Sequence, residues 1–179
     1  PVEWAVDRSG AWETSTNWST GTRPVAGDHI IIDRPSGEYL VTIASDPTVE
    51  RLRSTEPVLI NGRRLTVFDT ARFDAGLILS NGASLSQGMV ELNASATLVG
   101  SANMSLANTL VRNRGGFDWR QGGLILGGTS VFHNQAGGVF QVNKAGPPLD
   151  RSRFVSDSLQ DSVRALFLNE GVLRKVGGT

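Results

Sequence analysis

The sequence predicts an all-β fold, a right-handed parallel β-helix (β-solenoid) with an aromatic N-terminal cap. From about Leu59 to Leu173, short alternating apolar runs are each followed by a small or glycine-rich corner. Glycine supplies 21 of the 179 residues, whereas charged residues make up only 19%. Imperfect repetition on this scale is typical of stacked β-coils rather than of a closed globule.

Residues 1–35 are expected to form the cap, because they differ in composition from the rest. They hold Trp4, Trp12 and Trp18, whereas the only later tryptophan is Trp119. Val2, Trp4 and Val6 alternate as in a short strand, and residues 29–33 form a compact apolar run. Turn signals at Gly21–Pro24 and Ala26–Asp28 separate these pieces.

Residues 36–179 are expected to form the coils. Turn dipeptides arrive at close intervals and leave strands of about five residues between them. The predicted strands are 39–43, 49–52, 58–60, 65–68, 77–79, 89–92, 97–99, 109–111, 117–119, 124–126, 131–132 and 139–142.

An irregular insertion is expected near residues 145–165. The Ala145–Pro148 segment breaks the strand pattern, because proline removes a backbone hydrogen-bond donor. Within 156–168, Leu159, Val163, Leu166 and Phe167 fit one helical face, so this stretch is either a short helix or a loop between coils.

A β-sandwich is the alternative fold. Asn61-Gly62 and Asn81-Gly82 are suited to two-residue hairpin turns, which a sandwich needs. The spacing of similar corners favours the solenoid instead. Asn113 and Asn134 lie 21 residues apart, close to one turn of a three-sided coil, and Asn169 follows 35 residues later, which fits one coil plus the insertion.

These three asparagines, Asn113, Asn134 and Asn169, are predicted to stack at equivalent corners. Stacked asparagines bond along the axis of an array and satisfy turn backbone, as asparagine commonly does. Ligand binding is the less favoured reading of the same residues.

Composition limits the classes of function. Without cysteine, the chain forms no disulfide, thiol catalyst or zinc–thiolate site. Seventeen basic residues balance seventeen acidic ones, so nothing in the charge predicts a nucleic-acid partner. No apolar run approaches the roughly 20 residues of a membrane span. Pro1 is not a methionine, and the last repeat stops abruptly without a terminal cap. The chain is therefore expected to be an uncapped segment of a longer, secreted bacterial protein.

The opening residues Trp4, Gly10-Ala11-Trp12, Asn17-Trp18-Ser19 and Gly27–Ile32 carry a resemblance. Together with the coils at 132–140 and 167–179, they resemble β-solenoid modules of large bacterial surface and secreted proteins, of the autotransporter, filamentous-haemagglutinin and adhesin-like kind. The resemblance covers nearly the whole chain. It implies an extracellular or cell-surface location and a role in adhesion, display or spacing.

The tryptophans admit two interpretations. Trp12 and Trp18 either seal the open end of the first coil, which is the favoured reading, or form an exposed platform for a glycan. Trp119 shares a strand face with Phe117 and is expected in the core or an outer aromatic stack more than at a ligand site.

The sequence identifies no catalytic, cofactor-binding or metal-binding residue. Asp69, Asp74, Asp157 and Asp161 do not assemble into a paired-carboxylate site, and His29 and His133 lie far apart. The basic cluster of Arg51, Arg53, Arg63, Arg64 and Arg72 is expected to be solvated rather than to bind an anionic polysaccharide.

The predicted function is therefore a non-enzymatic, extracellular structural or adhesive module. Its expected partners are further copies of itself, joined end to end into an oligomer, fibre or surface layer, or surface glycans. A carbohydrate-binding module that uses the N-terminal tryptophans is the alternative, and a polysaccharide lyase or hydrolase on a β-helix is the third reading. The open C-terminal end is the expected place of function.

Overall fold

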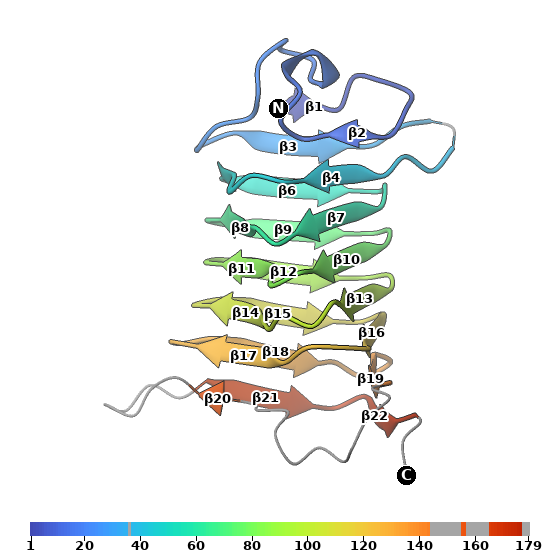
Figure 1. Cartoon of the computed structure of the whole chain (residues 1–179), viewed down its shortest axis with the longest axis vertical. Coiled ribbons are helices and arrows are strands. Elements are labelled where there is room, and N and C mark those ends of the chain that lie inside the picture. Colours follow the sequence, from blue (N-terminus) through green and yellow to red (C-terminus); the bar gives the residue numbers. More distant parts are fainter. Residues whose placement is uncertain (36, 144–154, 157–164, 177–179) are drawn as a thin grey trace.

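The computed structural model describes residues 1–35, 37–143, 155–156 and 165–176. It is a three-sided parallel β-solenoid whose coils stack along one axis, with the N-terminus at one end and the last coil at the other (Figure 1). The prediction of a parallel solenoid is confirmed, and the sandwich alternative is wrong, because every pair of named strands in the described chain is parallel.

Three sheets form the three sides, and each takes one strand from every coil. The first, which we call side A, is β1 (Val2–Glu3), β3 (His29–Ile32), β6 (Arg51–Ser54), β9 (Thr70–Phe73), β12 (Met89–Leu92), β15 (Leu110–Asn113), β18 (Val131–Asn134) and β21 (Leu166–Asn169).

Side B is β2 (Gly10–Ala11), β4 (Val41–Ile43), β7 (Val58–Asn61), β10 (Leu77–Ser80), β13 (Ala96–Val99), β16 (Gly116–Trp119), β19 (Val139–Val142) and β22 (Val172–Lys175). Side C is shorter: β5 (Thr48–Val49), β8 (Arg64–Val67), β11 (Ser84–Ser86), β14 (Met104–Ala107), β17 (Leu124–Gly127) and β20 (Val155–Ser156).

The coil length explains the sequence spacing. On side A, Val90 pairs with Val111 and Val111 pairs with Phe132, which are steps of 21 residues. Phe132 then pairs with Phe167, a step of 35. The register therefore pairs each residue with the equivalent residue of the next coil.

The two Asn-Gly dipeptides turn corners between sides instead of closing hairpins. Asn61-Gly62 leads from β7 on side B to β8 on side C, and Asn81-Gly82 leads from β10 to β11. Gly62 has φ 65° and Asn81 has φ 53°, so the same left-handed preference that suits hairpins serves a corner of the coil.

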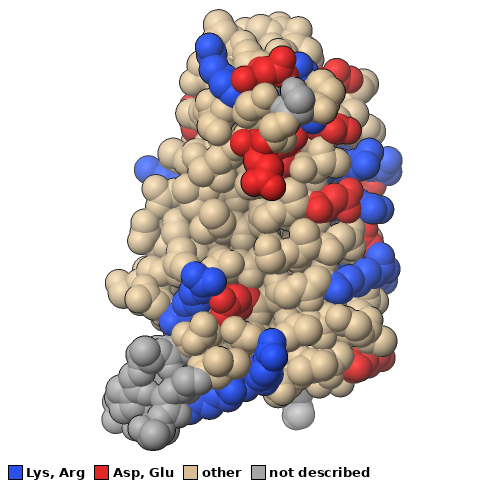
Figure 2. Space-filling model, turned by 90° about the vertical axis from the view of Figure 1, so that its right-hand side faces the viewer, with Lys and Arg blue, Asp and Glu red and all other residues tan. Residues whose placement is uncertain are grey.

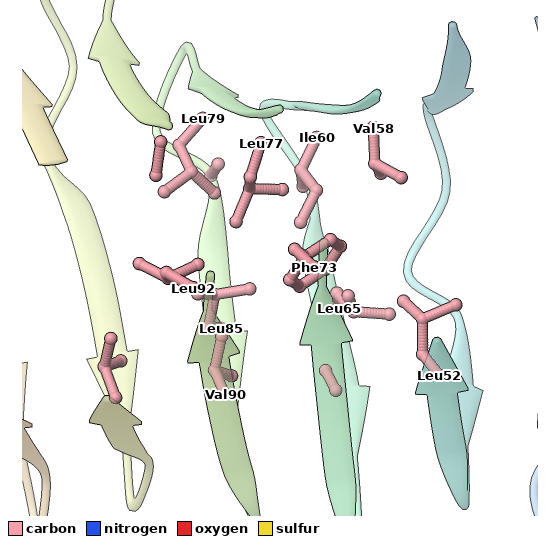
Figure 3. Packing of buried hydrophobic residues seen from close by; sticks show 14 of the residues in the cluster. Leu52, Val58, Ile60, Leu65, Phe73, Leu77, Leu79, Leu85, Val90 and Leu92 are labelled. Atoms are coloured by element: carbon pink, nitrogen blue, oxygen red, sulfur yellow. The ribbon is translucent and has the colours of Figure 1, made fainter. Parts of the chain in front are cut away.

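Inward-facing side chains from the three sides fill the axis of the solenoid. Figure 3 shows Leu52, Phe73 and Val90 of side A directed toward Ile60 and Leu77 of side B. In the later coils the filling becomes aromatic: Phe117 stacks on Phe140 with centroids 5.1 Å apart and an angle of 9° between the rings. The core is one continuous column from the tryptophans to Val142.

Residues 1–35 contribute strands as well as a cover. The first coil loops over the N-terminal end of the column, where the only described helical turn is η1 (Ser15–Asn17), a 3-10 helix (Figure 1). β3, within the same segment, pairs with β6 along its whole length. The cap is therefore built as the first part of the solenoid rather than as a separate unit.

The segment near 145–165 lies mostly outside the described residues. Its described strand β20 pairs with β17, so this part continues side C. Of the stretch 156–168 that fitted a helical face, residues 157–164 lie outside the described residues, whereas Leu166 and Phe167 belong to strand β21, so the helical reading is wrong for them.

Glycine at position 88 is required by the stacking. Gly88 has φ 46°, and a Cβ atom there would collide with the carbonyl oxygen of Val67 in the preceding coil and lie 2.5 Å from that of Asp69. Gly137, with φ 88°, has open space around its missing Cβ. A side chain at position 137 would therefore meet only the energetic cost of a left-handed backbone conformation. A side chain at position 88 would add the cost of the collision with the neighbouring backbone.

We expect Gly137→Ala to lower the free energy of unfolding by about 1–2 kcal/mol, the usual penalty for a left-handed residue. Gly88→Ala should cost about 2 kcal/mol more, because the neighbouring backbone must move. Urea unfolding of both variants measures this difference, and equal midpoints would contradict it.

Candidate functional site

Within the described residues, the last coil forms an apolar end that no further strand covers. Five of the seven large hydrophobic side chains exposed in the described chain lie on β21, on β22 or directly after β22: Leu166, Leu168, Val172, Leu173 and Val176. No described strand pairs with the outer edge of β21 or of β22. We call this surface, residues 166–176, the C-terminal face.

Inward-facing positions are exposed on this face because no strand of the described chain stacks on them. Leu173 follows buried Phe140 in its column, yet 57% of its surface is exposed. Lys175 follows Val142 in the next inward column. A charged residue at an inward position of an edge coil discourages the addition of strands from unrelated chains. The face therefore combines an apolar surface with a charge that limits which strands can pair with it.

The structure brings Asn113, Asn134 and Asn169 into one ladder. Asn113 Nδ2 donates to Asn134 Oδ1 at 2.7 Å, and Asn134 Nδ2 donates to Asn169 Oδ1 at 2.7 Å. Asn113 and Asn134 are fully buried at inward positions, whereas Asn169 lies exposed on the C-terminal face. These residues hold the last coil onto the coils before it.

The ladder has a direction and an unsatisfied end. Each amide donates toward the next coil, so the first acceptor, Asn113 Oδ1, faces the coil of Leu92, which offers no donor, and it has no hydrogen-bond partner. At the other end, Asn169 Nδ2 donates to Gly171 O at 3.1 Å. The asparagines thus organise the corner of the last coils, and no described contact directs them to a ligand.

Trp12 and Trp18 lie inside the cap. Their exposed fractions are 1% and 2%, and their rings meet edge to face with centroids 4.7 Å apart. Trp18 Nε1 donates to Trp12 O at 2.7 Å, and Trp4 packs against Trp18 at 5.1 Å. An indole stacks on a sugar through an exposed face, so neither residue provides the glycan platform that the alternative reading needs.

Trp119 is buried as well, with 1% exposed. It faces inward on β16, and its ring lies edge to face with Phe140 at 6.4 Å. Its Nε1 donates to Gly122 O at 3.0 Å. Trp119 is therefore a core residue and is not available to a glycan.

The structure gathers acidic and basic side chains on the outer surface of side A. Arg53, Arg72, Glu91, Arg112 and His133 follow one another in a single outward column, one per coil. These five residues lie 19 to 21 positions apart in the sequence, a spacing that indicates such a column. The sequence analysis did not predict the strand 70–73, on which Arg72 lies. Arg63 and Arg64 lie at the other corner, between sides B and C.

Asp74 joins this column through ion pairs, and Asp69 forms an ion pair with Arg51 beside the column. Arg51 lies 2.5 Å from Asp69, and Asp74 receives Arg72 at 2.8 Å and Arg53 at 3.4 Å. Hydrogen bonds from Thr70 and Arg51 lower the pKa of Asp69. Burial alone would raise the pKa of Asp74, but hydrogen bonds from Asn93 and Arg72 outweigh it and lower that pKa below 3.8.

A general acid needs a raised pKa, so these carboxylates are set up as ion-pair partners and not as proton donors. His133 Nε2 on β18 lies 2.9 Å from Glu170 Oε2 in the last coil, without the alignment of a hydrogen bond. Within the described residues, no cluster of three or more His, Asp or Glu side chains could hold a metal ion.

The face seen in Figure 2 is largely uncharged over the middle coils. Both signs occur near the N-terminal end, among the last coils and along the right-hand edge of the view. Outward positions in the middle of side B are Leu59, Ile78 and Thr97, which explains the uncharged area. Charge is therefore concentrated on side A and toward the two ends.

Glu56 is a buried acidic residue that the sequence analysis did not single out. It is 3% exposed, and Glu56 Oε2 accepts a hydrogen bond from Tyr39 N at 2.8 Å. Ser54 Oγ in turn donates to Glu56 O at 2.6 Å. Glu56 therefore anchors the chain that enters β4.

Comparison with known proteins adds no relative. No protein-family model, no curated protein and no solved structure matches the chain. No helix in the described residues is long and apolar enough to cross a membrane.

We expect Asn134→Leu to lower the free energy of unfolding by about 2–3 kcal/mol, because it removes both ladder hydrogen bonds and leaves the buried Asn113 amide with Val139 O as its acceptor, at 3.3 Å. Gln141→Leu, an outward change on the next strand, should have little effect. Hydrogen exchange should show that Asn134→Leu also weakens protection of 166–176. Equal stability of the two variants would contradict the ladder's role.

The ion pairs of Asp74 predict a pH dependence. Since the folded pKa lies below 3.8, ionised Asp74 stabilises the fold above that pH, and this contribution is lost as the pH falls through the lowered value. Asp74→Asn should cost about 1 kcal/mol at pH 7 and progressively less below pH 3.8.

Urea unfolding of wild type and Asp74→Asn between pH 2 and pH 7 tests this. Asn93→Ala removes a hydrogen bond that lowers this pKa, so in its background the Asp74→Asn change should cost less stability. A difference between wild type and Asp74→Asn that stays constant over the whole pH range would overturn the assignment.

Proposed function

We propose that the chain is a non-enzymatic structural module, a stiff β-solenoid that associates with a second copy through its C-terminal face. The observation that carries the proposal is the exposure of Leu173, an inward-facing residue with 57% of its surface open. Burying such a residue is favourable at roughly 25 cal/mol per Å² of apolar area.

The unequal ends favour a pair of C-terminal faces over a repeating contact. At the N-terminal end, the tryptophan cluster and its loops cover the column. The C-terminal face carries Glu170 together with Arg174 and Lys175, so it is self-complementary in charge. A contact that uses the same face on both copies closes at two and leaves no end for a fibre.

The non-enzymatic part of the proposal is supported by the state of the carboxylates. Asp69, Asp74 and Asp118 are each engaged by arginine within 3.4 Å. The extracellular or cell-surface location, and a role as spacer or adhesive surface, draw their support from the resemblance of the N-terminal text and the coils to bacterial surface modules.

Light scattering across concentration tests the association. We expect the mass to rise from one copy to two between low micromolar and high micromolar protein. Leu173→Asp should stay at one copy, because a carboxylate would be buried in the contact. Phe68→Asp, a change at an equally exposed hydrophobic residue on a middle coil, should pair like the wild type.

A wild-type chain that is a strict monomer at the highest concentration would overturn the proposal. So would a Leu173→Asp variant that pairs normally. Growth beyond two copies would show a contact between unlike ends, and it would replace the paired arrangement with a fibre.

A further inference from the structure

Side C lacks a strand at the N-terminal end of the solenoid. Sides A and B each continue beyond the β3–β4–β5 coil, with β1 and β2. On side C, β5 is the last strand at this end of the described chain. At this level the chain forms the loop that follows the tryptophans, and residues 23–26 of that loop line one wall of the space beside β5.

The outer edge of β5 presents a free backbone donor and acceptor. Thr66 N donates to Pro47 O at 3.0 Å and Phe68 N donates to Val49 O at 3.1 Å, while Thr48 is the register partner of Thr66. In a parallel ladder this pattern turns the N–H and C=O of Thr48 away from β8. They make no hydrogen bond with another group of the described chain.

A groove of about 510 Å³ borders this edge. Its walls come from the loop after the tryptophans on one side and from the corner before β5 on the other. The lining residues are Trp12, Arg23, Pro24, Val25, Ala26, Ser45, Asp46, Pro47 and Thr48. The volume lies within the usual range for ligand sites.

The walls are held in place by Asp28. Val25 N donates to Asp28 Oδ2 at 2.8 Å, and Asp28 N donates back to Val25 O at 3.1 Å. Asp28 O then accepts from Glu50 N at 3.0 Å, directly after β5. The loop is thereby tied to the coil whose edge it faces, so the groove is a built feature of the cap.

We propose that this groove binds an extended peptide, which adds a parallel strand to the edge of β5 and supplies the strand that side C lacks. Backbone pairing gives such a complex its affinity, and alternate side chains contact the walls. Pro24, Val25 and Pro47 suit apolar side chains, and Val25 is 63% exposed in the empty groove.

Charge adds a further element of recognition. Arg23 is exposed and makes no ion pair in the described chain, so it can receive a carboxylate of the peptide. A glycan fits the same groove poorly, because Trp12 lines it with only 1% of its surface exposed and offers no ring face for stacking. The proposal does not depend on pairing through the C-terminal face.

The probe is the peptide acetyl-Leu-Thr-Val-Phe-Asp-amide, which copies residues 65–69. Those residues include most of β8, which lies against β11 as the proposed strand would lie against β5. Titration followed by amide chemical shifts should show saturable binding centred on Thr48 and on Arg23–Ala26. Arg23→Ala should weaken it, whereas Arg112→Ala, on β15 of side A and several coils away from the groove, should not.

Two changes test the strand pairing itself. Thr48→Pro removes the free N–H and should weaken binding by about tenfold, the loss of one good hydrogen bond. The same peptide N-methylated at its valine should bind as weakly to the unaltered protein, so the test stands even if Thr48→Pro fails to fold. A peptide with the residue order reversed should also bind more weakly.

Three results would overturn the proposal. One is the absence of saturable binding at millimolar peptide. Another is binding that N-methylation leaves unchanged, or that shifts the amides of β22 instead of Thr48. The third is occupation of the groove by an oligosaccharide or by a second copy of the chain, the latter shown by concentration-dependent shifts at Thr48 without peptide.

Discussion

The parallel, in-register pairing of each coil with the next is the interaction on which the rest of the structure depends. Neighbouring strands lie about 4.8 Å apart, so a residue and its equivalent one coil later are fixed at contact distance. Identical side chains then act together: Asn134 bonds to both Asn113 and Asn169 because the register places them in one column. Core stacks and outward charges follow the same rule.

The repeat made the fold readable from the sequence, and the spacing of 21 and 35 residues between asparagines is the observed register. Three of the strands that were missed, β9, β11 and β14, contain Arg72 or serines at outward positions, so they do not form apolar runs in the sequence. Their strand character comes from the coils on either side. The β-propensity of one segment taken alone does not show that its neighbouring coils will hold it as a strand.

The candidate sites were less predictable from the sequence. They arise where a neighbouring strand is absent, and not from a characteristic set of residues. Sequence placed Trp12 either in a cap or on a platform, and only the packing against Trp18 decides between them. Thr48 carries no chemical signal at all. It matters because side C begins one coil later than sides A and B, which no local pattern reveals.

The two ends therefore offer different kinds of binding. At the N-terminal end, the tryptophans seal the column, and the edge of β5 presents one residue's backbone groups with a shaped groove beside it. At the C-terminal face, two whole strands and the inward Leu173 are open, so the surface is larger and more apolar. Since Lys175 continues a core column there, a partner must also accommodate a cation. The two proposed associations are therefore restricted in different ways, by a narrow groove at the N-terminal end and by an inward charge at the C-terminal face.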